Sequence, residues 1–327
     1  MDIKKLDAQI AALLEQRARL VAGRQDAKSR EKVFPTEAKM RILKDIASVC
    51  EALVRPKKVA FLGPLYSYTH LATERFFGKG IDRAPVVTIE GVFAEVRDGQ
   101  SDFGVVPLEN STDGRVVDTL EMFTTCPVRI CGEVELPIHH ALLAACRREE
   151  ITEVQSKPQA LSQCRHWLLK HLPGVKLTEV SSTAAAAKNA KSRPNVAAVA
   201  SPMAAEAYGL STLADAIEDN PRNVTRFVVV GKDVVPSRSK EDKTTLMFHL
   251  PHTAGSLADA MMTFRRHHVN LTWIESFPIP GEPGAYLFFV TLEGHCEELK
   301  VRRVLAQLEK KTDRLTVLGS YPAAKKT

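Results

Sequence analysis

A hydroxyl and a permanent cation stand side by side where a polar loop enters an apolar run. The stretch NPRNVTRFVVVG, residues 220–231, places Thr225 and Arg226 directly before four strand-forming residues. If the stretch is extended, the two side chains point to opposite faces, because successive side chains of a strand alternate. The pattern predicts that Thr225 and Arg226 do not contact the same ligand atom. Arg226 either meets an anionic ligand or forms a structural ion pair.

The stretch VVPLENSTDG carries a second group of polar side chains directly after an apolar run. Asn110 can donate an amide hydrogen, Ser111 can anchor a carboxylate, and Glu109 can order the loop. A purely structural reading is that Asn110 stabilises the turn before Gly114. Both readings place these residues where a strand ends, which is where ligands bind in open α/β sheets.

Two further stretches have the same character. In SKPQALSQC, Ser156 and Gln163 are seven residues apart, so they can share one face if a helix begins near Pro158. FLGPLYSYTH follows an apolar run and contains Ser67, Thr69 and His70. A histidine there can titrate near neutral pH or simply serve as a polar residue at a helix start.

Composition limits the classes of function. The chain has 327 residues, of which 44% are hydrophobic, and this is enough for two or three globular domains. The net charge of +6 is not arranged as a basic stripe with aromatics, which argues against nucleic-acid binding and suits small anionic ligands. No stretch resembles a signal peptide or a membrane span, and the six cysteines have no zinc-site spacing. We expect a cytoplasmic protein with reduced thiols and no bound metal.

The pattern along the chain predicts three segments. Residues 1–55 are helical, with Arg17 on the apolar stripe of the first helix and Lys28 on nearly the same face. Those two cations either meet an anion or extend to water at a helix end. Residues 57–235 alternate near-continuous apolar strands with helices, which is typical of an α/β domain covered on both faces. Residues 243–327 follow the order βαββαβ.

The four polar stretches, in this order and at these spacings, resemble the prephenate dehydratase family. The resemblance implies a two-lobed α/β core similar to periplasmic ligand-binding folds, with the site in the cleft. It implies loss of water and CO2 from prephenate to give phenylpyruvate, a step of L-phenylalanine biosynthesis that needs no cofactor. The implied catalytic residues are Thr225, Asn110 and Gln163. The implied substrate-binding residues are Glu109, Ser111, Ser156, Arg226, Ser67, Thr69 and His70.

The last segment resembles an ACT domain of the phenylalanine-sensing kind, through GSLA at 255–258 and ESFP at 275–278. The resemblance implies feedback regulation by L-phenylalanine and a homodimer or homotetramer. The implied effector-binding residues are Gly255, Ser256, Leu257, Asn270, Leu271, Glu275 and Ser276. Two positions depart from the family pattern: Phe277 stands where the family usually has arginine, and Tyr66 stands where it usually has glycine.

The first segment resembles the N-terminal helix of an all-helical chorismate mutase. Arg17 and Lys28 match two cationic substrate ligands of that fold and define a residual mutase site. Fewer residues precede the dehydratase-like segment than three such helices need, so we expect a remnant without mutase activity that can serve dimerisation.

Three alternatives remain open from the sequence. An arogenate dehydratase runs the same elimination on the amino-acid analogue, and a bifunctional enzyme retains mutase activity. A non-catalytic amino-acid sensor would only bind ligands. A sensor has no need for Thr225, Asn110 and Gln163 together, so their combined presence favours the enzyme.

Overall fold

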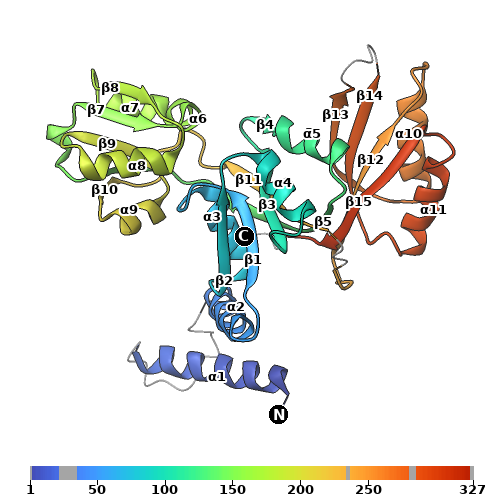
Figure 1. The fold of residues 1–327 in the computed structure, drawn as a ribbon, viewed down its shortest axis with the longest axis horizontal. Coiled ribbons are helices and arrows are strands. Elements are labelled where there is room, and N and C mark those ends of the chain that lie inside the picture. Colours follow the sequence, from blue (N-terminus) through green and yellow to red (C-terminus); the bar gives the residue numbers. More distant parts are fainter. Residues whose placement is uncertain (1, 22–34, 233–235, 280–284, 325–327) are drawn as a thin grey trace.

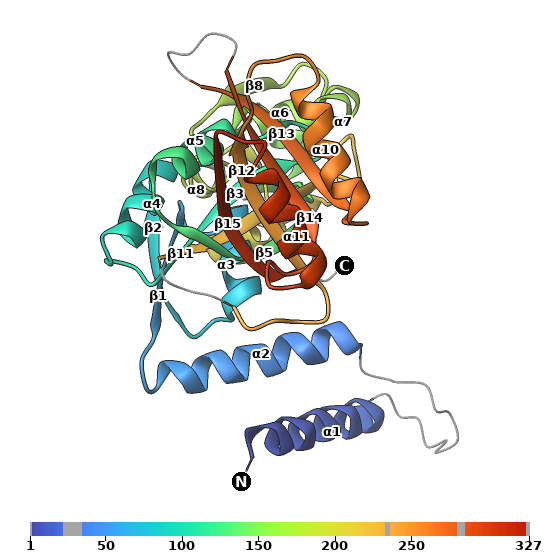
Figure 2. The ribbon, with the colours of Figure 1, turned by 90° about the vertical axis from the view of Figure 1, so that its right-hand side faces the viewer.

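The computed structural model describes residues 2–21, 35–232, 236–279 and 285–324. They form three β-sheets with flanking helices, preceded by a pair of helices that projects from one side (Figures 1 and 2). The α/β architecture expected from the sequence is confirmed. Lys28 lies outside the described residues. No helix in the described part of the chain is long and apolar enough to span a membrane.

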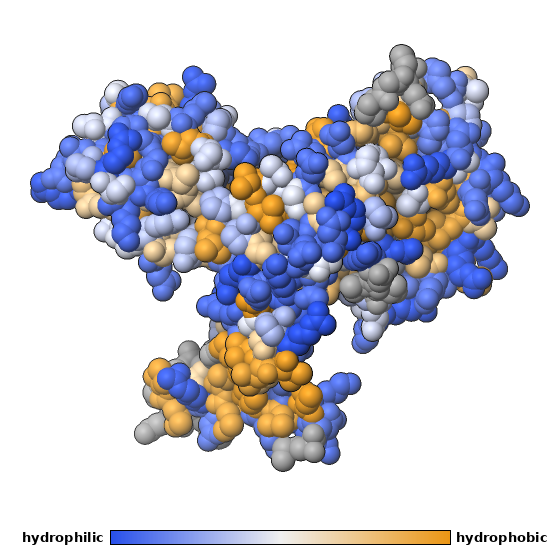
Figure 3. Space-filling view, viewed as in Figure 1, coloured by the Kyte–Doolittle hydropathy of each residue, from blue (hydrophilic) through white to orange (hydrophobic). Residues whose placement is uncertain are grey.

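The projecting pair consists of α1 (Ile3–Val21) and α2 (Thr36–Ala52). No residue of α1 is buried, and in α2 only Ser48 is, where its hydroxyl accepts a hydrogen bond from Gly80 N at 3.0 Å. Apolar side chains gather on the surface of this pair (Figure 3), including Leu13 and Val49, which are 63% and 49% exposed. The amphipathic sequence thus forms helices whose apolar stripe is only partly covered within one chain.

The first large sheet has the strand order β2-β1-β3-β11-β5, with the short β4 paired to β3. Its core strands are buried on both faces, as their near-continuous apolar sequence predicts. Helix α3 covers one face, and α4 and α5 cover the other (Figure 1). The elements are β1 (Lys57–Leu62), α3 (Tyr68–Phe77), β2 (Ile81–Val86), α4 (Ile89–Arg97), β3 (Phe103–Asn110), β4 (Gly114–Arg115), α5 (Val117–Thr125), β5 (Arg129–Pro137) and β11 (Val224–Gly231).

The second sheet has the order β10-β6-β9-β7-β8. The chain enters it after β5 and returns to the first sheet at β11, so two crossings join two lobes. Helix α6 begins at Pro158, as the sequence predicts. The elements are β6 (Ala141–Ala144), a 3₁₀ turn (Arg148–Glu150), β7 (Glu153–Ser156), α6 (Pro158–Gln163), α7 (Arg165–His171), β8 (Lys176–Glu179), α8 (Thr183–Ser192), β9 (Val196–Ala200), α9 (Pro202–Tyr208) and β10 (Ser211–Ala214).

The third sheet, which we call the ACT sheet, has the order β13-β14-β12-β15 and the expected βαββαβ sequence of elements. Helices α10 and α11 pack on one face, where Phe264 and Val304 meet Phe248. The elements are β12 (Asp242–His249), α10 (Ser256–Arg266), β13 (Leu271–Pro278), β14 (Tyr286–Glu293), α11 (Leu299–Leu308) and β15 (Arg314–Pro322).

The other face of the ACT sheet continues the hydrophobic core of the first lobe. Trp273, Phe277, Phe289 and Tyr321 belong to the same buried cluster as Phe123 in α5. The approach is close at β15, since a Cβ on Gly319 would lie 2.0 Å from the carbonyl oxygen of Ile130 in β5. The ACT sheet and the first lobe therefore share one hydrophobic core.

Candidate active site

The register of β11 against β3 separates two pairs of functional residues. Thr225 lies opposite Asn110, and Arg226 lies opposite Glu109. Because side chains alternate along a strand, Thr225 and Asn110 share one face of the sheet, while Arg226 and Glu109 share the other. The predicted separation of Thr225 from Arg226 is what the structure shows.

Asn110 and Thr225 are in direct contact. The Asn110 Nδ2 group donates hydrogen bonds to Thr225 Oγ1 at 2.7 Å and to Asn223 Oδ1 at 2.9 Å. An amide nitrogen can only donate, so the Thr225 oxygen accepts and its own hydroxyl hydrogen remains available. No acceptor for that hydrogen is found among the residues that the structure describes. Thr225 is 8% exposed, so it is a poorly hydrated hydroxyl with one proton to offer.

The network continues into the second lobe through Gln163. Asn223 Nδ2 donates to Gln163 Oε1 at 3.1 Å, and Gln163 Nε2 donates to Asp113 Oδ2 at 2.7 Å. Gln159 donates to the same Asp113 oxygen. Asp113 follows β3 in the first lobe and Gln163 ends α6 in the second, so these bonds span the junction of the lobes.

His140 and Tyr68 extend the network further. His140 Nε2 lies 2.9 Å from Gln163 Oε1, and since an amide oxygen only accepts, Nε2 carries the hydrogen. The Tyr68 hydroxyl lies 2.6 Å from the His139 carbonyl oxygen and 3.0 Å from His140 Nδ1. Burial lowers the pKa of His140 and raises the pKa of Tyr68 well above its usual value. Both groups are therefore neutral near pH 7.

Asn110 and Ser111 also hold the loop after β3. The Asn110 Oδ1 atom accepts from the backbone N–H groups of Thr112 and Asp113 at 2.9 and 3.0 Å. The Ser111 hydroxyl accepts from Val224 N at 2.9 Å. The turn-forming role of Asn110 and its contact with Thr225 thus coexist, because its two side-chain atoms face different partners.

Arg226 and Glu109 face away from this network toward the ACT sheet. The Arg226 guanidinium lies 4.7 Å above the Trp273 ring and forms ion pairs with Glu109 at 3.4 Å and Glu133 at 3.8 Å. Only 8% of the Arg226 side chain is exposed. Of the two roles open to Arg226, the structure shows the structural ion pair.

The glycine-containing turn after β1 is organised around α3. Ser67 caps the helix, since its hydroxyl accepts from His70 N at 3.2 Å. His70 is 4% exposed, its Nδ1 accepts from Tyr66 N at 3.0 Å, and its ring stacks on Phe61. Burial lowers the pKa of His70, so the ring is neutral near pH 7. Thr69 is buried. These residues shape the turn, and none joins the Thr225 network in the described structure.

Tyr66 occupies a backbone position that favours glycine. Its φ is 67°, and its ring packs edge-on against Tyr208 of the second lobe, with the ring centres 5.6 Å apart. The Ser201 hydroxyl of that lobe donates to the Tyr66 carbonyl at 3.3 Å. The ring and the backbone carbonyl of Tyr66 therefore bridge the two lobes.

Ser156 and Gln163 do not come together as the sequence predicts. Ser156 is fully buried in β7, and its hydroxyl donates to the Val199 carbonyl at 2.5 Å. Gln163 is held by the network at the lobe junction. The shared helical face does not exist, because Ser156 belongs to the strand that precedes α6.

The predicted effector residues lie at opposite ends of the ACT sheet, some at the start of α10 and the others along β13. Gly255, with φ of 90°, precedes Ser256 and Leu257 at the start of α10, at the same end of the ACT sheet as Ser276. Asn270 and Leu271 lie at the other end of β13, about 20 Å away at about 3.3 Å per residue. These residues do not form one site within a single chain.

Glu275 and Phe277 point toward the first lobe rather than toward α10. Glu275 forms an ion pair with Arg115 of β4 at 3.1 Å. Phe277 is 6% exposed and packs edge-on against Phe289 in the shared core. An aromatic ring at position 277 fits this apolar setting, where an unpaired arginine would be costly to bury.

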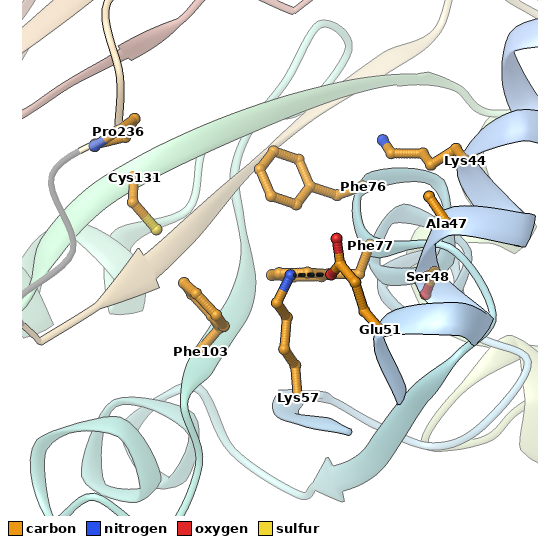
Figure 4. A pocket seen from close by; sticks show the side chains of 10 residues that line it. All are labelled: Lys44, Ala47, Ser48, Glu51, Lys57, Phe76, Phe77, Phe103, Cys131 and Pro236. Atoms are coloured by element: carbon orange, nitrogen blue, oxygen red, sulfur yellow. Dashed lines mark hydrogen bonds and ion pairs between the residues drawn. The ribbon is translucent and has the colours of Figure 1, made fainter. Parts of the chain in front are cut away.

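Of the predicted residual mutase site, only Arg17 belongs to the described residues. Arg17 is exposed on α1, which has no buried residue, and Lys28 lies outside the described residues. A cavity of about 310 Å³ lies instead between α2 and the first sheet (Figure 4). Its walls include the rings of Phe76, Phe77 and Phe103, and it contains no member of the Thr225 network.

Several network members were not selected from the sequence. Asn223 and Asp113 lie inside the quoted stretches, two or three residues from Thr225 and Asn110. Tyr68 lies inside the quoted stretch FLGPLYSYTH, between Ser67 and Thr69, whereas His140 carries no local signal, because its partners come from other elements. Asn223, Asp113 and Tyr68 could therefore have been found from their place in the quoted stretches, as could Gln159 in SKPQALSQC.

Most of the chain resembles known proteins. Residues 59–234 match the family model described as prephenate dehydratase. The bifunctional chorismate mutase/prephenate dehydratase of Aquifex aeolicus is 41% identical over 99% of this chain and 96% of its own length. That alignment is longer than this chain, so the relative has positions with no counterpart here.

Two solved structures resemble the chain over most of its length. A prephenate dehydratase from Arthrobacter aurescens in complex with L-Phe is 34% identical, with a TM-score of 0.76, over 83% of this chain and 91% of its own. A protein described as a novel type of quorum quenching acylase, GqqA, is 30% identical, with a TM-score of 0.75, over 82% of this chain and 98% of its own.

Proposed function

The chain belongs to the prephenate dehydratase family, and we propose that Thr225 is the group that helps the ring hydroxyl of prephenate depart. In this reaction the bond from the ring to its carboxylate breaks and releases CO2. The electron pair forms a ring double bond and displaces the hydroxyl, which takes up a proton and leaves as water. Aromatisation supplies the driving force. The protein must hold the substrate and protonate or hydrogen-bond a poor leaving group.

The orientation of the Thr225 hydroxyl carries this proposal. Asn110 donates to the Thr225 oxygen, so the hydroxyl hydrogen is left to point at an incoming oxygen. A donation from Asn110 also makes the Thr225 hydroxyl a better donor, because chained hydrogen bonds polarise one another. Asn223 accepts from Asn110 and donates in turn to Gln163 of the second lobe, so closure of the lobes and orientation of the hydroxyl are linked.

The test compares two substitutions of Thr225. Wild-type protein incubated with prephenate should form phenylpyruvate, followed by its absorbance. Thr225→Val keeps the shape but removes the hydroxyl, and we expect kcat to fall by about 10² or more. Thr225→Ser keeps the hydroxyl, so its kcat should fall much less than that of Thr225→Val. An unchanged kcat in Thr225→Val would remove Thr225 from the mechanism.

We further propose that L-phenylalanine regulates the enzyme through the ACT sheet. The solved relative from Arthrobacter aurescens contains L-Phe. The first turn of α10 offers free backbone N–H groups at a helix N-terminus, which suit a carboxylate. Binding there should lower dehydratase activity.

We propose a homodimer in which β13 pairs with its own copy. β13 is an edge strand of the ACT sheet, and an unpaired edge readily accepts another strand. Antiparallel pairing would bring the start of β13 in one chain beside its end in the other. Asn270 of one chain would then approach the Gly255 turn of its partner. If the apolar stripe of α1 and α2 also pairs, the assembly is a tetramer.

Assays with both substrates separate the alternatives, with phenylpyruvate followed as the product of prephenate and L-phenylalanine as the product of arogenate. An arogenate dehydratase would turn over arogenate with a higher kcat/KM than prephenate. A sensor would bind but not convert either compound.

We propose the cytoplasm as the location of the protein, because all six cysteines are free thiols.

A further inference from the structure

Arg226 lies between the proposed catalytic hydroxyl and the ACT sheet. Its neighbour Thr225 faces the Asn110 network, while its own guanidinium lies 4.7 Å above the ring of Trp273 in β13. Trp273 is 8% exposed and belongs to the core that joins the ACT sheet to the first lobe. A displacement of β13 would therefore reach β11 through one buried contact.

Glu133, a carboxylate that pairs with Arg226, also contacts residues 236–324, the segment that carries the ACT sheet and is called the ACT segment here. The Glu133 side chain is fully buried in β5, and its Oε1 accepts from Lys243 Nζ of β12 at 2.6 Å and from Ala324 N at 2.8 Å. Its Oε2 lies 3.8 Å from Arg226 Nη1. The charge balance of Arg226 thus depends on groups contributed by the ACT segment.

The cluster is incompletely satisfied. Arg226 Nε and Nη2, Glu133 Oε2 and Trp273 Nε1 are buried without a hydrogen-bond partner among the described residues. Such atoms are rare in folded proteins, and each can gain a bond if its neighbours shift slightly. A small movement of the ACT sheet would allow Arg226 and Glu133 to form the hydrogen bonds that the present distance of 3.8 Å does not.

The strand that carries Thr225 can respond locally. The pairing of β11 with β3 is irregular between Arg226 and Phe227, and β3 contributes Pro107, which has no N–H to donate. Beyond this point Val228, Val229 and Val230 are completely buried and continue the regular pairing with β3, although the pairing with β5 shifts between Val229 and Val230. On the β3 side the register of Thr225 and Arg226 is thereby offset from that of the three valines, while on the β5 side both residues stay paired in register with Leu136 and Glu135.

We propose that Arg226 is a positioning residue that transmits the position of Trp273 in the ACT sheet to the hydroxyl of Thr225. This inference rests on the proposed function, and it deepens the regulation of that site. When β13 moves, the guanidinium follows the ring and shifts between Trp273, Glu109 and Glu133. The backbone of Arg226 then alters the distance between Thr225 and Asn110.

The first experiment tests positioning without an effector. Trp273→Leu should lower kcat for prephenate by about 10-fold with KM changed by less than about 3-fold, because substrate contacts are untouched. Trp273→Phe keeps a ring under the guanidinium and should restore most of kcat. In a Thr225→Val background, Trp273→Leu should have no further effect beyond about 2-fold. Equal effects in both backgrounds would show that Trp273 acts only through general packing and would overturn the proposal.

The second experiment tests transmission. Calorimetry should show that Trp273→Leu binds L-phenylalanine within about 3-fold of wild type, while maximal inhibition falls at least about 5-fold. The matched control is Phe289→Leu, which trims the same core without touching Arg226 and should remain inhibited. Inhibition retained in Trp273→Leu, or lost equally in both variants, would overturn the proposed route.

The outcomes separate this inference from the proposed function. Wild-type protein that forms no phenylpyruvate would refute the proposed function itself. Wild-type turnover that is insensitive to phenylalanine would overturn the regulatory half of the inference. The positioning of Thr225 would then be tested only by comparing the effect of Trp273→Leu in the wild-type and Thr225→Val backgrounds.

Discussion

At the scale of single residues, the site depends on the direction of a few hydrogen bonds. Asn110 can serve both as a turn former and as a donor to Thr225, because its oxygen and nitrogen face opposite sides. Gln163 likewise accepts from Asn223 and donates to Asp113. Each amide uses both ends, so substitution of any one member leaves a partner unsatisfied, which costs about 1–3 kcal/mol when the partner is buried.

His140 should make stability depend on pH. Its pKa is lowered mainly by burial, which outweighs the hydrogen bond to Gln163. The unfolded chain takes up this proton near pH 6.5 and the folded chain only at lower pH, so acidification from about pH 7 favours unfolding. His140→Gln should show a smaller fall in the free energy of unfolding between about pH 7 and pH 5.5, measured by urea titration.

The control for this prediction is the exposed His252. His252→Gln should keep the wild-type pH dependence, because burial, the main cause of the lowered pKa of His140, is absent at this exposed side chain. If His140→Gln retains the full wild-type fall, His140 does not contribute to acid sensitivity.

At the scale of elements, the first turn of α10 depends on a backbone conformation. Gly255 has φ of 90°, and a Cβ there would meet nothing within 4 Å, so a side chain is disfavoured by strain rather than by contact. Gly255→Ala should therefore distort the proposed carboxylate receptor and weaken L-phenylalanine binding by at least about 10-fold, measured by calorimetry.

Gly174 provides a matched control, since it has φ of 79° and equally open surroundings. Gly174→Ala introduces the same kind of strain between α7 and β8, away from the ACT sheet. Its effector affinity should remain that of wild type. Equal weakening in both variants would mean that loss of stability, not the α10 turn, is responsible.

The element α1 leads to a prediction about chorismate. Arg17 is exposed and α1 has no buried residue, so the described helices do not enclose an anionic substrate. We expect no enzymatic conversion of chorismate to prephenate, followed as loss of chorismate absorbance. Turnover that Arg17→Ala abolishes would show that a working mutase site exists.

At the scale of the whole molecule, assembly should depend on the edge strand β13. Ile274 is 45% exposed on this strand, and a charge there would disfavour strand pairing. We expect Ile274→Glu to halve the mass of the assembly in analytical ultracentrifugation and to weaken L-phenylalanine binding. Val49→Glu on α2 is the comparison. If only Val49→Glu reduces the mass, the chains associate through the helices instead.

Membership of the family and the α/β character followed from the sequence, because they rest on local information. Apolar runs that alternate with helices require a doubly covered sheet whatever the tertiary details. Strand alternation likewise placed Thr225 and Arg226 on opposite faces, since that rule needs only an extended backbone. The start of α6 at Pro158 also follows from local information, because proline favours the first position of a helix.

The composition of the site was decided by tertiary structure. Ser156 and Gln163 are close in sequence, yet one is buried inside a sheet and the other lies at the lobe junction. His140 joined the network without any sequence signal, because its partners Tyr68 and Gln163 come from distant elements. The role of Arg226 was left open until β13 placed Trp273 beneath its guanidinium. Local spacing fixes the direction of a side chain, but packing between elements decides what it meets.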